Sequence, residues 1–397
     1  MSKKLKIAIY SGQIPSTTFI ESLIKAVAKT HQVILFGSQT KAVNYNSTNI
    51  IIHKTPKGNG LKLLYNTWRS LKLVVRRPRD LWHLLKDVNK HPSAYKKWQA
   101  YSRLLPMVLY KPDIIHIQWA KSLEEFMLLK IQYNIPIILS LRGAHINYSP
   151  IASRALAKSY RKNFPQVTAF HAVSDAIGIE AQKYGAPPDR ITVIHSLVPQ
   201  VFLDAYQPIQ QRISKPFKII SVGRPHWIKG YPDAIYAIAA LKKQGFAVTY
   251  QIIGMDTPDE ELLFLIAELG LQKQVTLRGN VQQAELIKIM QDQDALLLSS
   301  LEEGIANVVL EAMAIGLPVI STNCGGMSEV VIPNKTGFLV PVRDPEAMAQ
   351  AILELYALPI SNLQQQIQRA HNLIKTKFNT ETNMATFLTF YENIYKK

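Results

Sequence analysis

Residues 299–322 have the sequence SSLEEGIANVVLEAMAIGLPVIST. A short apolar run, ALLLSS, ends at Ser300, a loop holding Glu303 and Gly304 follows, and a helical pattern from about Asn307 leads to a second apolar run, PVIST. This alternation is typical of a β–α–β unit in a parallel sheet. Glu303 is therefore predicted at the carboxyl edge of the sheet, where such folds bind ligands.

The same alternation extends along the whole chain. The β-rich runs are KIAIY, VILFG, NIIIH, DIIHIQW, PIILSLRG, AFHAVS and TVIHS, followed by KIISVGR, TYQIIG, VTLRG, ALLLSS and PVIST. Between the two series lies DAYQPIQQRISKP, a polar segment with two prolines that is typical of a linker. We therefore predict two doubly wound α/β domains, 1–203 and 217–378, joined by a linker at 204–216. A terminal amphipathic helix at 379–397 is expected to pack back on the first domain.

Length and composition restrict the class of protein. The chain has 397 residues, 47% hydrophobic and 19% charged, which is the composition of a globular protein with two domains. It has no run of eighteen apolar residues, and the N-terminal KIAIY is interpreted as a first strand rather than a signal peptide. The single cysteine, Cys324, fits a reducing compartment. Together these features predict a cytoplasmic protein.

The net charge of +18 is concentrated in one segment. Residues 54–111 contain fourteen lysines and arginines against two aspartates, interleaved with tryptophan and tyrosine. This pattern favours contact with an anionic lipid surface. The residues expected there are Trp68, Arg69, Arg76, Arg77, Arg79 and Trp82. The alternative is a solvated basic face on one helical insertion. Nucleic-acid binding is not expected, because the chain lacks a recognisable nucleic-acid-binding motif.

The segment VGRPHWIKG, residues 222–230, follows a predicted strand and precedes a predicted helix. Gly223 permits a tight turn, and Arg224 and Lys229 then stand near a helix N-terminus. Backbone N–H groups, the helix dipole and two cations are the components of an anion site. The alternative is that both side chains are simply solvated.

Glu303 and Glu311 are candidates for binding a polyhydroxylated ligand. Because Glu303 lies in the loop and Glu311 on the following helix, both carboxylates can face one cleft. Carboxylates are strong acceptors for sugar hydroxyls. The alternative is that both residues only favour the helix, through propensity and through the helix dipole.

Taken together, VGR…KG, S-x-x-EG-x₆-EAMA-x-G-x-PVI and GG-x-x-EVV resemble glycosyltransferase family 4. The resemblance is specific in the second half and weaker in the first, where PSTTFIESLIKAVAK and HAVSDAIGIEAQKYG carry it. It implies the GT-B fold, in which two Rossmann-like domains face each other across a cleft. It also implies a retaining enzyme that moves a sugar from a nucleotide-diphosphate sugar to an acceptor hydroxyl.

The resemblance assigns roles to individual residues. Arg224 and Lys229 match the pair that holds the diphosphate, Glu311 matches the carboxylate on the ribose, and Glu303 matches the one that faces the donor sugar. Other donor-binding positions are Gly223, Gly254, Asn280, Val281, Gly304, Ile305, Ala306, Asn307 and Val308. Gly12 and Thr18 are expected on the acceptor side. Apart from the donor, no cofactor is expected.

One departure affects the predicted catalytic residues. Many family members have H-G-x-D after the strand that here has the sequence ILSLRGAHI, whereas this chain has Arg142-Gly-Ala-His145. Arg142 is interpreted as an acceptor-side or transition-state cation, and His145 as catalytic or structural.

Other polar residues are interpreted as structural. Asp292-Gln-Asp294 resembles a metal-binding D-x-D, but it is predicted at the amino end of its strand, away from the site. His116 is interpreted as a packed core histidine, and Ser140 and Ser174 as having no nearby base. No metal site is predicted.

The predicted function is metal-independent sugar transfer in the synthesis of a surface polysaccharide or glycolipid. The acceptor is expected to be a saccharide, linked to lipid, and the enzyme to lie on the inner face of the membrane. Two alternatives remain open: a noncatalytic donor-binding or scaffold subunit of the same fold, and a sugar-nucleotide epimerase, which would lack the EAMA pattern.

Overall fold

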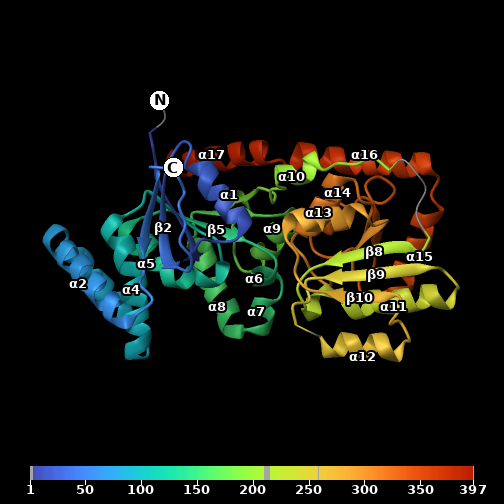
Figure 1. Ribbon diagram of the computed structural model, residues 1–397. Coiled ribbons are helices and arrows are strands. Elements are labelled where there is room, and N and C mark those ends of the chain that lie inside the picture. The colour runs from blue at the N-terminus through green and yellow to red at the C-terminus, as the bar shows by residue number, and fades with distance from the viewer. Residues whose placement is uncertain (1–2, 210–214, 258, 397) are drawn as a thin grey trace. The chain divides into compact units, whose positions relative to one another are not determined.

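The computed structural model describes residues 3–209, 215–257 and 259–396 of the chain. It contains two parallel β-sheets (Figure 1). Each sheet lies in its own unit. The first unit comprises the described residues of 1–173, 177–194 and 384–397, and the second those of 174–176 and 195–383.

The first unit contains a seven-stranded sheet with the order β3-β2-β1-β4-β5-β6-β7, and every neighbouring pair is parallel. Its strands are β1 (Lys6–Ile14), β2 (Gln32–Gln39), β3 (Ile50–Lys54), β4 (Ile114–Ile117), β5 (Ile137–Leu141), β6 (Ala169–Ala172) and β7 (Ile191–Val193). The strand order reverses between β1 and β4, and ligands of doubly wound sheets bind at such a switch point, beyond the carboxyl ends.

The second unit repeats this arrangement with six parallel strands in the order β10-β9-β8-β11-β12-β13. They are β8 (Phe217–Val222), β9 (Val248–Ile253), β10 (Val275–Arg278), β11 (Ala295–Leu298), β12 (Val319–Thr322) and β13 (Phe338–Val340). Here the switch point lies between β8 and β11. The apolar runs quoted above all form strands, as predicted, whereas the short edge strand β13 was not predicted.

Helices cover both sheets. In and around the first unit they are α1 (Thr18–Val27), α2 (Asn59–Arg76), α3 (Pro78–Val88), α4 (Ala94–Tyr110), α5 (Leu123–Tyr133), α6 (Ala144–Asn147), α7 (Ser149–Ala152), α8 (Arg154–Asn163), α9 (Asp175–Gln182) and α17 (Thr380–Lys396). The others are α10 (Gln200–Asp204), α11 (Tyr231–Lys243), α12 (Glu260–Glu268), α13 (Gln283–Gln291), α14 (Asn307–Ile315), α15 (Pro345–Ala357) and α16 (Ile360–Lys377).

The basic segment forms three helices, α2, α3 and α4, between β3 and β4, rather than one helical insertion. The C-terminal half of α4 is almost wholly buried, whereas α2 buries only Asn66, Arg69 and Leu73. Figure 1 shows α2 farther from the sheet than α4. The outer surface of α2 is therefore open to solvent over most of its length.

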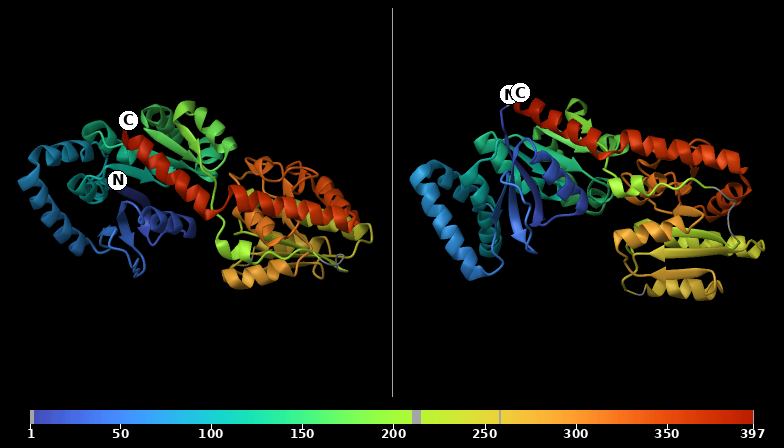
Figure 2. Two further views of the ribbon diagram at one scale, coloured as in Figure 1. Left: turned by 90° about the horizontal axis from the view of Figure 1, so that it is seen from above. Right: turned by 45° about the horizontal axis from the view of Figure 1, so that its top comes forward.

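Helix α17 completes the core of the first unit although it ends the described chain. Tyr391 Oη lies 2.7 Å from Nδ1 of His116 in β4, and the Phe387 ring packs against His171 in β6. Lys3, the first described residue, contacts Tyr395 in α17, and Figure 2 shows the start of β1 near this helix. The central strands of this unit are thus covered by a helix formed at the far end of the sequence.

Candidate functional site

The loop after β8 packs against the loop after β9 through backbone atoms of two glycines, Gly223 and Gly254. Gly254 has φ +115°, and a Cβ atom there would lie 2.5 Å from the carbonyl oxygen of Gly223. The Gly223 amide donates to Ile253 O at 2.8 Å, and Tyr231 Oη donates to Gly223 O at the same distance. Only glycine fits at position 254, because any side chain would push the two loops apart. Both predicted glycines therefore shape the turn that presents Arg224.

The same loop is also fixed to the loop after β11. Lys229 ends a short 3₁₀ turn, η4 (Trp227–Lys229), and its carbonyl accepts a hydrogen bond of 2.8 Å from Ser299 Oγ. The Leu301 amide donates to Ile228 O at 2.7 Å. These bonds join the two loops that border the switch point of the second unit. The sequence pattern gave no signal for this role of Ser299.

Lys229 and Glu303 meet at this point. Lys229 Nζ lies 2.7 Å from Glu303 Oε1, and the same oxygen accepts a hydrogen bond of 2.9 Å from Ser300 Oγ. Both side chains are about four-fifths buried, with exposed fractions of 19% and 18%. The predicted phosphate-binding cation and sugar-binding carboxylate are therefore held together, with little solvent between them.

A tight contact with the loop after β12 fixes the backbone of Glu303. Gly325 has φ +50°, and a Cβ atom there would lie 1.7 Å from Glu303 O. The Gly326 amide donates to Gly304 O at 2.9 Å. The glycine pair of GG-x-x-EVV thus sets the position of the Glu303–Gly304 loop.

Glu311 lies on the first turns of α14, which begins at Asn307 as predicted. Its carboxylate is half-buried and has no hydrogen-bond or ion-pair partner among the described residues. Burial raises the pKa of Glu311 to about 7. An acceptor that is kept partly dry and unpaired is suited to receive donor hydroxyl groups.

In the segment 304–308, backbone groups rather than side chains are the candidates for contact with a ligand. Ile305, Ala306 and Val308 are buried in the core, and only Asn307 has an exposed side chain. The amide groups of Gly304 and Ile305 have no hydrogen-bond acceptor among the described residues. These N–H groups can donate to a ligand.

Asn280 and Val281 follow β10. The Asn280 amide donates to Asp256 Oδ1 at 2.7 Å, and its side chain also bonds Asp256. Val281 packs partly buried against the core. This links the loop after β10 to the loop after β9.

Arg224 completes the set in the second unit. It is exposed and has no ion-pair partner among the residues that the structure describes. Arg224 and Lys229 follow β8, and Glu303 follows β11, so all three lie where the strand order reverses. Cations, carboxylates and free amides are the groups required to bind a phosphorylated sugar.

In the first unit, Arg142 follows β5. Its guanidinium lies over the Phe19 ring, 3.8 Å from the ring centroid, and its Nη2 donates to Gln118 Oε1 at 3.2 Å. Its Nε is buried without a partner among the described residues. Burial lowers the pKa of Arg142 to about 9. Gln118, directly after β4, was not predicted as a site residue.

His145 lies three residues later in α6. Its ring packs 5.5 Å from the Trp119 ring, and its Nδ1 is buried without a partner in the described part of the chain. Burial, with a smaller effect from Lys121, lowers the pKa of His145 to about 4. The imidazole is therefore neutral near pH 7.

Gly12 and Thr18, the two residues predicted on the acceptor side, lie near the carboxyl end of β1. Gly12 has φ +90° at an irregularity in the pairing of β1 with β2, and its carbonyl lies against Gly37. Thr18 begins α1, but its side chain lies outside the described part of the structure. These contacts give Gly12 a conformational role and leave its role toward an acceptor as a prediction.

The interpretation of Ser140 was wrong in one respect. Ser140 Oγ lies 2.8 Å from His116 Nε2 and 2.9 Å from His171 Nδ1, so two bases are near it. All three side chains are buried, and burial lowers the pKa of His116 well below its usual value. No substrate can reach this serine, so the contacts hold the core together. The prediction that His116 is a core histidine is confirmed.

Two residues predicted at a membrane surface are wrongly placed for that role. Arg69 is only 3% exposed, and its Nη2 donates to Lys54 O at 3.0 Å. Arg77 is partly buried, donates to Val108 O at 3.1 Å and pairs with Asp80. Helical spacing alone could not tell which face of α2 packs inward. Arg76 and Arg79 are exposed, as are Trp68 and Trp82.

Asp292 and Asp294 bind the first residues of β8, as the amino-end prediction requires. Lys218 donates from its amide to Asp294 Oδ2 at 2.7 Å and from its side chain to Asp292. Among the described residues, no group of three or more His, Cys, Asp or Glu side chains is placed to hold a metal ion. Within the same residues, no helix has the length and apolar character needed to cross a membrane.

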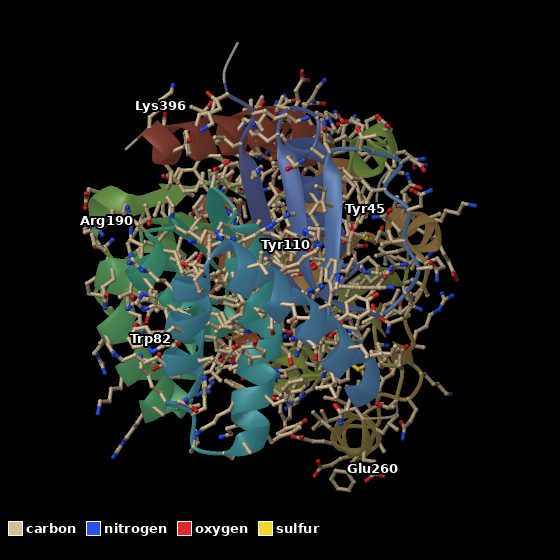
Figure 3. The ribbon with its side chains drawn as sticks, turned by 90° about the vertical axis from the view of Figure 1, so that its left-hand side faces the viewer. Tyr45, Trp82, Tyr110, Arg190, Glu260 and Lys396 are labelled. Atoms are coloured by element: carbon tan, nitrogen blue, oxygen red, sulfur yellow. The ribbon has the colours of Figure 1, made fainter. Side chains whose placement is uncertain are left out.

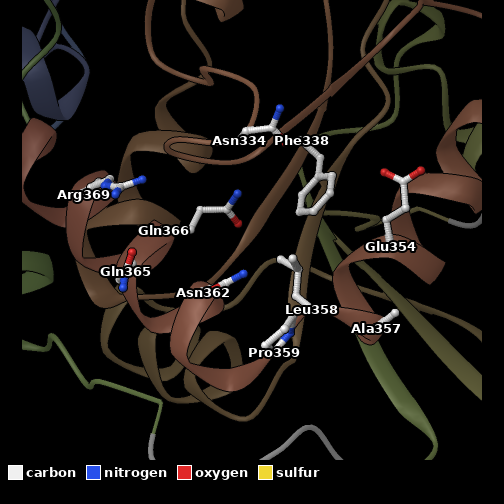
Figure 4. A pocket seen from close by; sticks show the side chains of 10 residues that line it. All are labelled: Asn334, Phe338, Glu354, Ala357, Leu358, Pro359, Asn362, Gln365, Gln366 and Arg369. Atoms are coloured by element: carbon white, nitrogen blue, oxygen red, sulfur yellow. The ribbon is translucent and has the colours of Figure 1, made fainter.

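A cavity of about 560 Å³ lies elsewhere in the second unit, between the end of α15 and the start of α16 (Figure 4). Phe338, Glu354, Gln366 and Arg369 line it. Phe338 is the first residue of β13, so the cavity lies toward the amino end of that strand. It is therefore separate from the carboxyl-edge residues described above.

Two family models match successive parts of the chain. The model of Glycosyltransferase Family 4 matches residues 16–199, and that of Glycosyl transferases group 1 matches residues 204–373. A relative from Escherichia coli K12, the putative colanic acid biosynthesis glycosyltransferase WcaL, is 32% identical over 241 residues. The aligned segment spans 58% of this chain and 59% of that relative.

Solved structures agree with the fold over nearly the whole chain. A glycosyltransferase from Rickettsia africae ESF-5 matches with a TM-score of 0.73 at 18% identity, covering 99% of both chains. Anabaena Alr3699/HepE, solved in complex with UDP and glucose, matches with a TM-score of 0.68 at 16% identity, covering 98% of this chain and 100% of that one. These likenesses confirm the predicted GT-B fold.

Proposed function

Because the chain belongs to glycosyltransferase family 4, we propose that it transfers a sugar from a nucleoside diphosphate sugar to an acceptor hydroxyl, with retention of configuration. The observation that carries this proposal is the Lys229–Glu303 pair, 2.7 Å apart at the switch point of the second unit. Arg224 in the loop after β8 and Glu311 on α14 have no ion-pair partner in the described part of the chain. The relatives named for colanic acid synthesis support a role in the synthesis of a surface polysaccharide.

Each group has a distinct task in this proposal. Arg224 and Lys229 hold the diphosphate and offset the negative charge that grows on it as the bond to the anomeric carbon breaks. The acceptor oxygen bonds to that carbon on the same face, and its proton passes to the departing phosphate oxygen. Glu303 and the amides of Gly304 and Ile305 bind the sugar, and Glu311 binds the ribose hydroxyls. The products are the glycosylated acceptor and the nucleoside diphosphate.

A panel of nucleoside diphosphate sugars tests the activity, with release of nucleoside diphosphate as the readout. Wild type should turn over one or a few donors, and Lys229→Ala and Glu303→Ala should lose ~100-fold or more of this rate. Lys243→Ala, an exposed lysine on α11, is the matched control. Equal, slow hydrolysis of every donor by wild type and Lys229→Ala would favour a scaffold subunit. Conversion of the donor sugar without its release would favour an epimerase.

We further propose that the acceptor is lipid-linked and that α2 brings the enzyme to an anionic membrane. The inner side of α2 buries the polar Asn66 and Arg69 together with Leu73, whereas its outer side carries a longer apolar stripe. This stripe consists of Leu64, Trp68, Leu71 and Val75, spaced three or four residues apart, and Val75 is 84% exposed. A helix that is more apolar outside than inside has no reason to face water alone.

Charge supports a lipid surface as the partner of this stripe. Helix α2 contains no acidic residue, and Lys72 Nζ lies 3.5 Å from the centroid of the exposed Trp68 ring. On α3, Lys86 lies over the exposed Trp82 ring. Figure 3, which views the molecule from the left-hand side of Figure 1, labels Trp82. Cationic and aromatic side chains around an apolar stripe are typical of a helix that lies in the headgroup layer.

A further inference from the structure

Arg142 is a partly buried cation that has no anionic partner among the described residues of the first unit. Its guanidinium stacks on Phe19 and makes one hydrogen bond, to the neutral Gln118. Among the described residues no carboxylate pairs with it, and Nε is buried without a partner. A guanidinium removed from water in this way is costly unless a negative group compensates for it.

Arg69 in the same unit shows what distinguishes Arg142. Both side chains lack a carboxylate partner in the described part of the chain, and both retain unpaired nitrogen atoms. Arg69 is enclosed between α2 and β3, where it donates to Lys54 O, and no ligand can reach it. Arg142 remains partly open to solvent and follows β5, at the carboxyl edge near the switch point. Only Arg142 can therefore receive its counter-charge from outside.

His145 adds a directed donor to the same edge. Its Nδ1 is buried and unpaired, so the neutral tautomer with the proton on Nε2 avoids burying an unsatisfied N–H group. This tautomer leaves Nε2–H available to an acceptor atom. Lys121, close enough to affect His145 electrostatically, makes the surroundings more positive. Gln118, fully buried, holds the Arg142 guanidinium in place.

We propose that Arg142 and His145 form a subsite for an oxyanion, a carboxylate or phosphate, carried by the acceptor saccharide. Gln118 is a positioning residue, because it reaches the ligand only through Arg142. The inference rests on the proposed function, in which Arg224 and Lys229 of the second unit hold the donor diphosphate. The subsite predicts that an acidic or phosphorylated sugar is preferred over a neutral one.

Binding, measured without turnover, tests the subsite. The full chain is labelled with ¹⁵N-arginine, and the Arg142 Nε–Hε signal is assigned by its loss in Arg142→Gln. D-glucuronate and D-glucose 6-phosphate should shift this signal saturably, and D-glucose should not. Affinity for the two anions, measured by calorimetry, should fall ~10-fold or more in Arg142→Gln and less in Arg142→Lys, since a charge-assisted bond is lost. Arg161→Gln, an exposed arginine of the same unit, should bind like wild type.

Several outcomes decide the proposal. Equal anion affinity in wild type and Arg142→Gln, with thermal unfolding confirming that both are folded, would overturn it, as would equal shifts from glucuronate and glucose. A parallel titration with UDP identifies whether the oxyanion bound by Arg142 belongs to the acceptor or to the donor. If UDP alone shifts the Arg142 signal and blocks the effect of glucuronate, the charge belongs to the donor and the acceptor assignment is wrong. Because no step requires sugar transfer, failure here is distinct from failure of the proposed activity.

Discussion

Lys229 Nζ and Glu303 Oε1 lie 2.7 Å apart, joining the loop after β8 to the loop after β11. In the proposed reaction these two groups serve different parts of one donor, the phosphates and the sugar. The donor must therefore compete with the ion pair for both partners. Without the donor, the ion pair keeps both side chains oriented. When the donor binds, Lys229 would contact its phosphates and Glu303 its sugar in place of each other.

Single substitutions in this pair should cost almost as much as the double substitution. Lys229→Met and Glu303→Gln should each lower kcat/KM for the donor ~100-fold or more, and the double variant should lose much less than the product of the two effects. Steady-state kinetics on the three variants measures this, with Lys243→Met as a control. Strictly multiplicative losses would show that the two residues act independently.

Glu311 should make stability and nucleotide binding depend on pH in opposite directions. Its pKa is raised from 4.5 to about 7, so the folded state holds a proton that the unfolded state has released. Stability from this group is therefore present below pH 4.5 and lost as the pH rises to about 7. Glu311→Gln should be more stable than wild type at pH 8, by up to ~3 kcal/mol, and nearly equal at pH 4.5.

Nucleoside diphosphate affinity should rise with pH through about 7, because the ionised Glu311 is the better acceptor for ribose hydroxyls. This rise should disappear in Glu311→Gln. Urea unfolding and calorimetry across the pH range provide the two measurements, and Glu261→Gln on the exposed side of α12 is the control. A pH profile that is unchanged in Glu311→Gln would exclude this carboxylate from the nucleotide site.

Gly325→Ala should move the Glu303 loop. The new Cβ would lie 1.7 Å from Glu303 O, a backbone atom that cannot rotate away. We expect a loss of about 2 kcal/mol or more in the free energy of unfolding and a drop in activity of ~10-fold or more. Gly245→Ala is a matched control, since Gly245 has φ +75° but no atom within 4 Å of its added Cβ. Equal effects of the two substitutions would mean that the contact with Glu303 is unimportant.

The outer stripe of α2 should bind anionic vesicles. At low salt, wild type should co-sediment with vesicles of phosphatidylglycerol and phosphatidylcholine, and Leu71→Glu with Val75→Glu should weaken binding ~10-fold or more. Leu263→Glu with Phe264→Glu makes the same charge change at exposed apolar residues of the second unit and should bind like wild type. Wild type that stays in the supernatant at low salt would remove the membrane proposal.

The sequence predicted the fold well because buried parallel strands are continuous apolar runs, which patterns such as ALLLSS make visible. Strand β13 was missed because Phe338–Val340 has three residues at the edge of the sheet, too few for a periodic signal. The placement of Glu303 and Arg224 in loops at strand ends followed from chain order. These features depend on local sequence.

Features that depend on packing were not predictable. Arg69 belongs to a basic helix, yet it lies on the buried side of α2 with Asn66 and Leu73 and donates to Lys54 O. The pairing of Lys229 with Glu303 joins residues 74 positions apart, and the contact of Ser140 with His116 and His171 requires three adjacent strands. Periodicity identifies a face of an element, but only the neighbouring element determines whether that face is buried.

The hydrogen bond between Tyr391 and His116 has a consequence for synthesis of the chain. Its partners are 275 residues apart in the sequence. In the sequence, the described part of the second unit comes after β4 and β6 and before the residues of α17 that contact them. During translation the first sheet emerges early, with His116 and His171 still lacking their cover from α17. The first sheet therefore lacks these contacts until α17 has been synthesised.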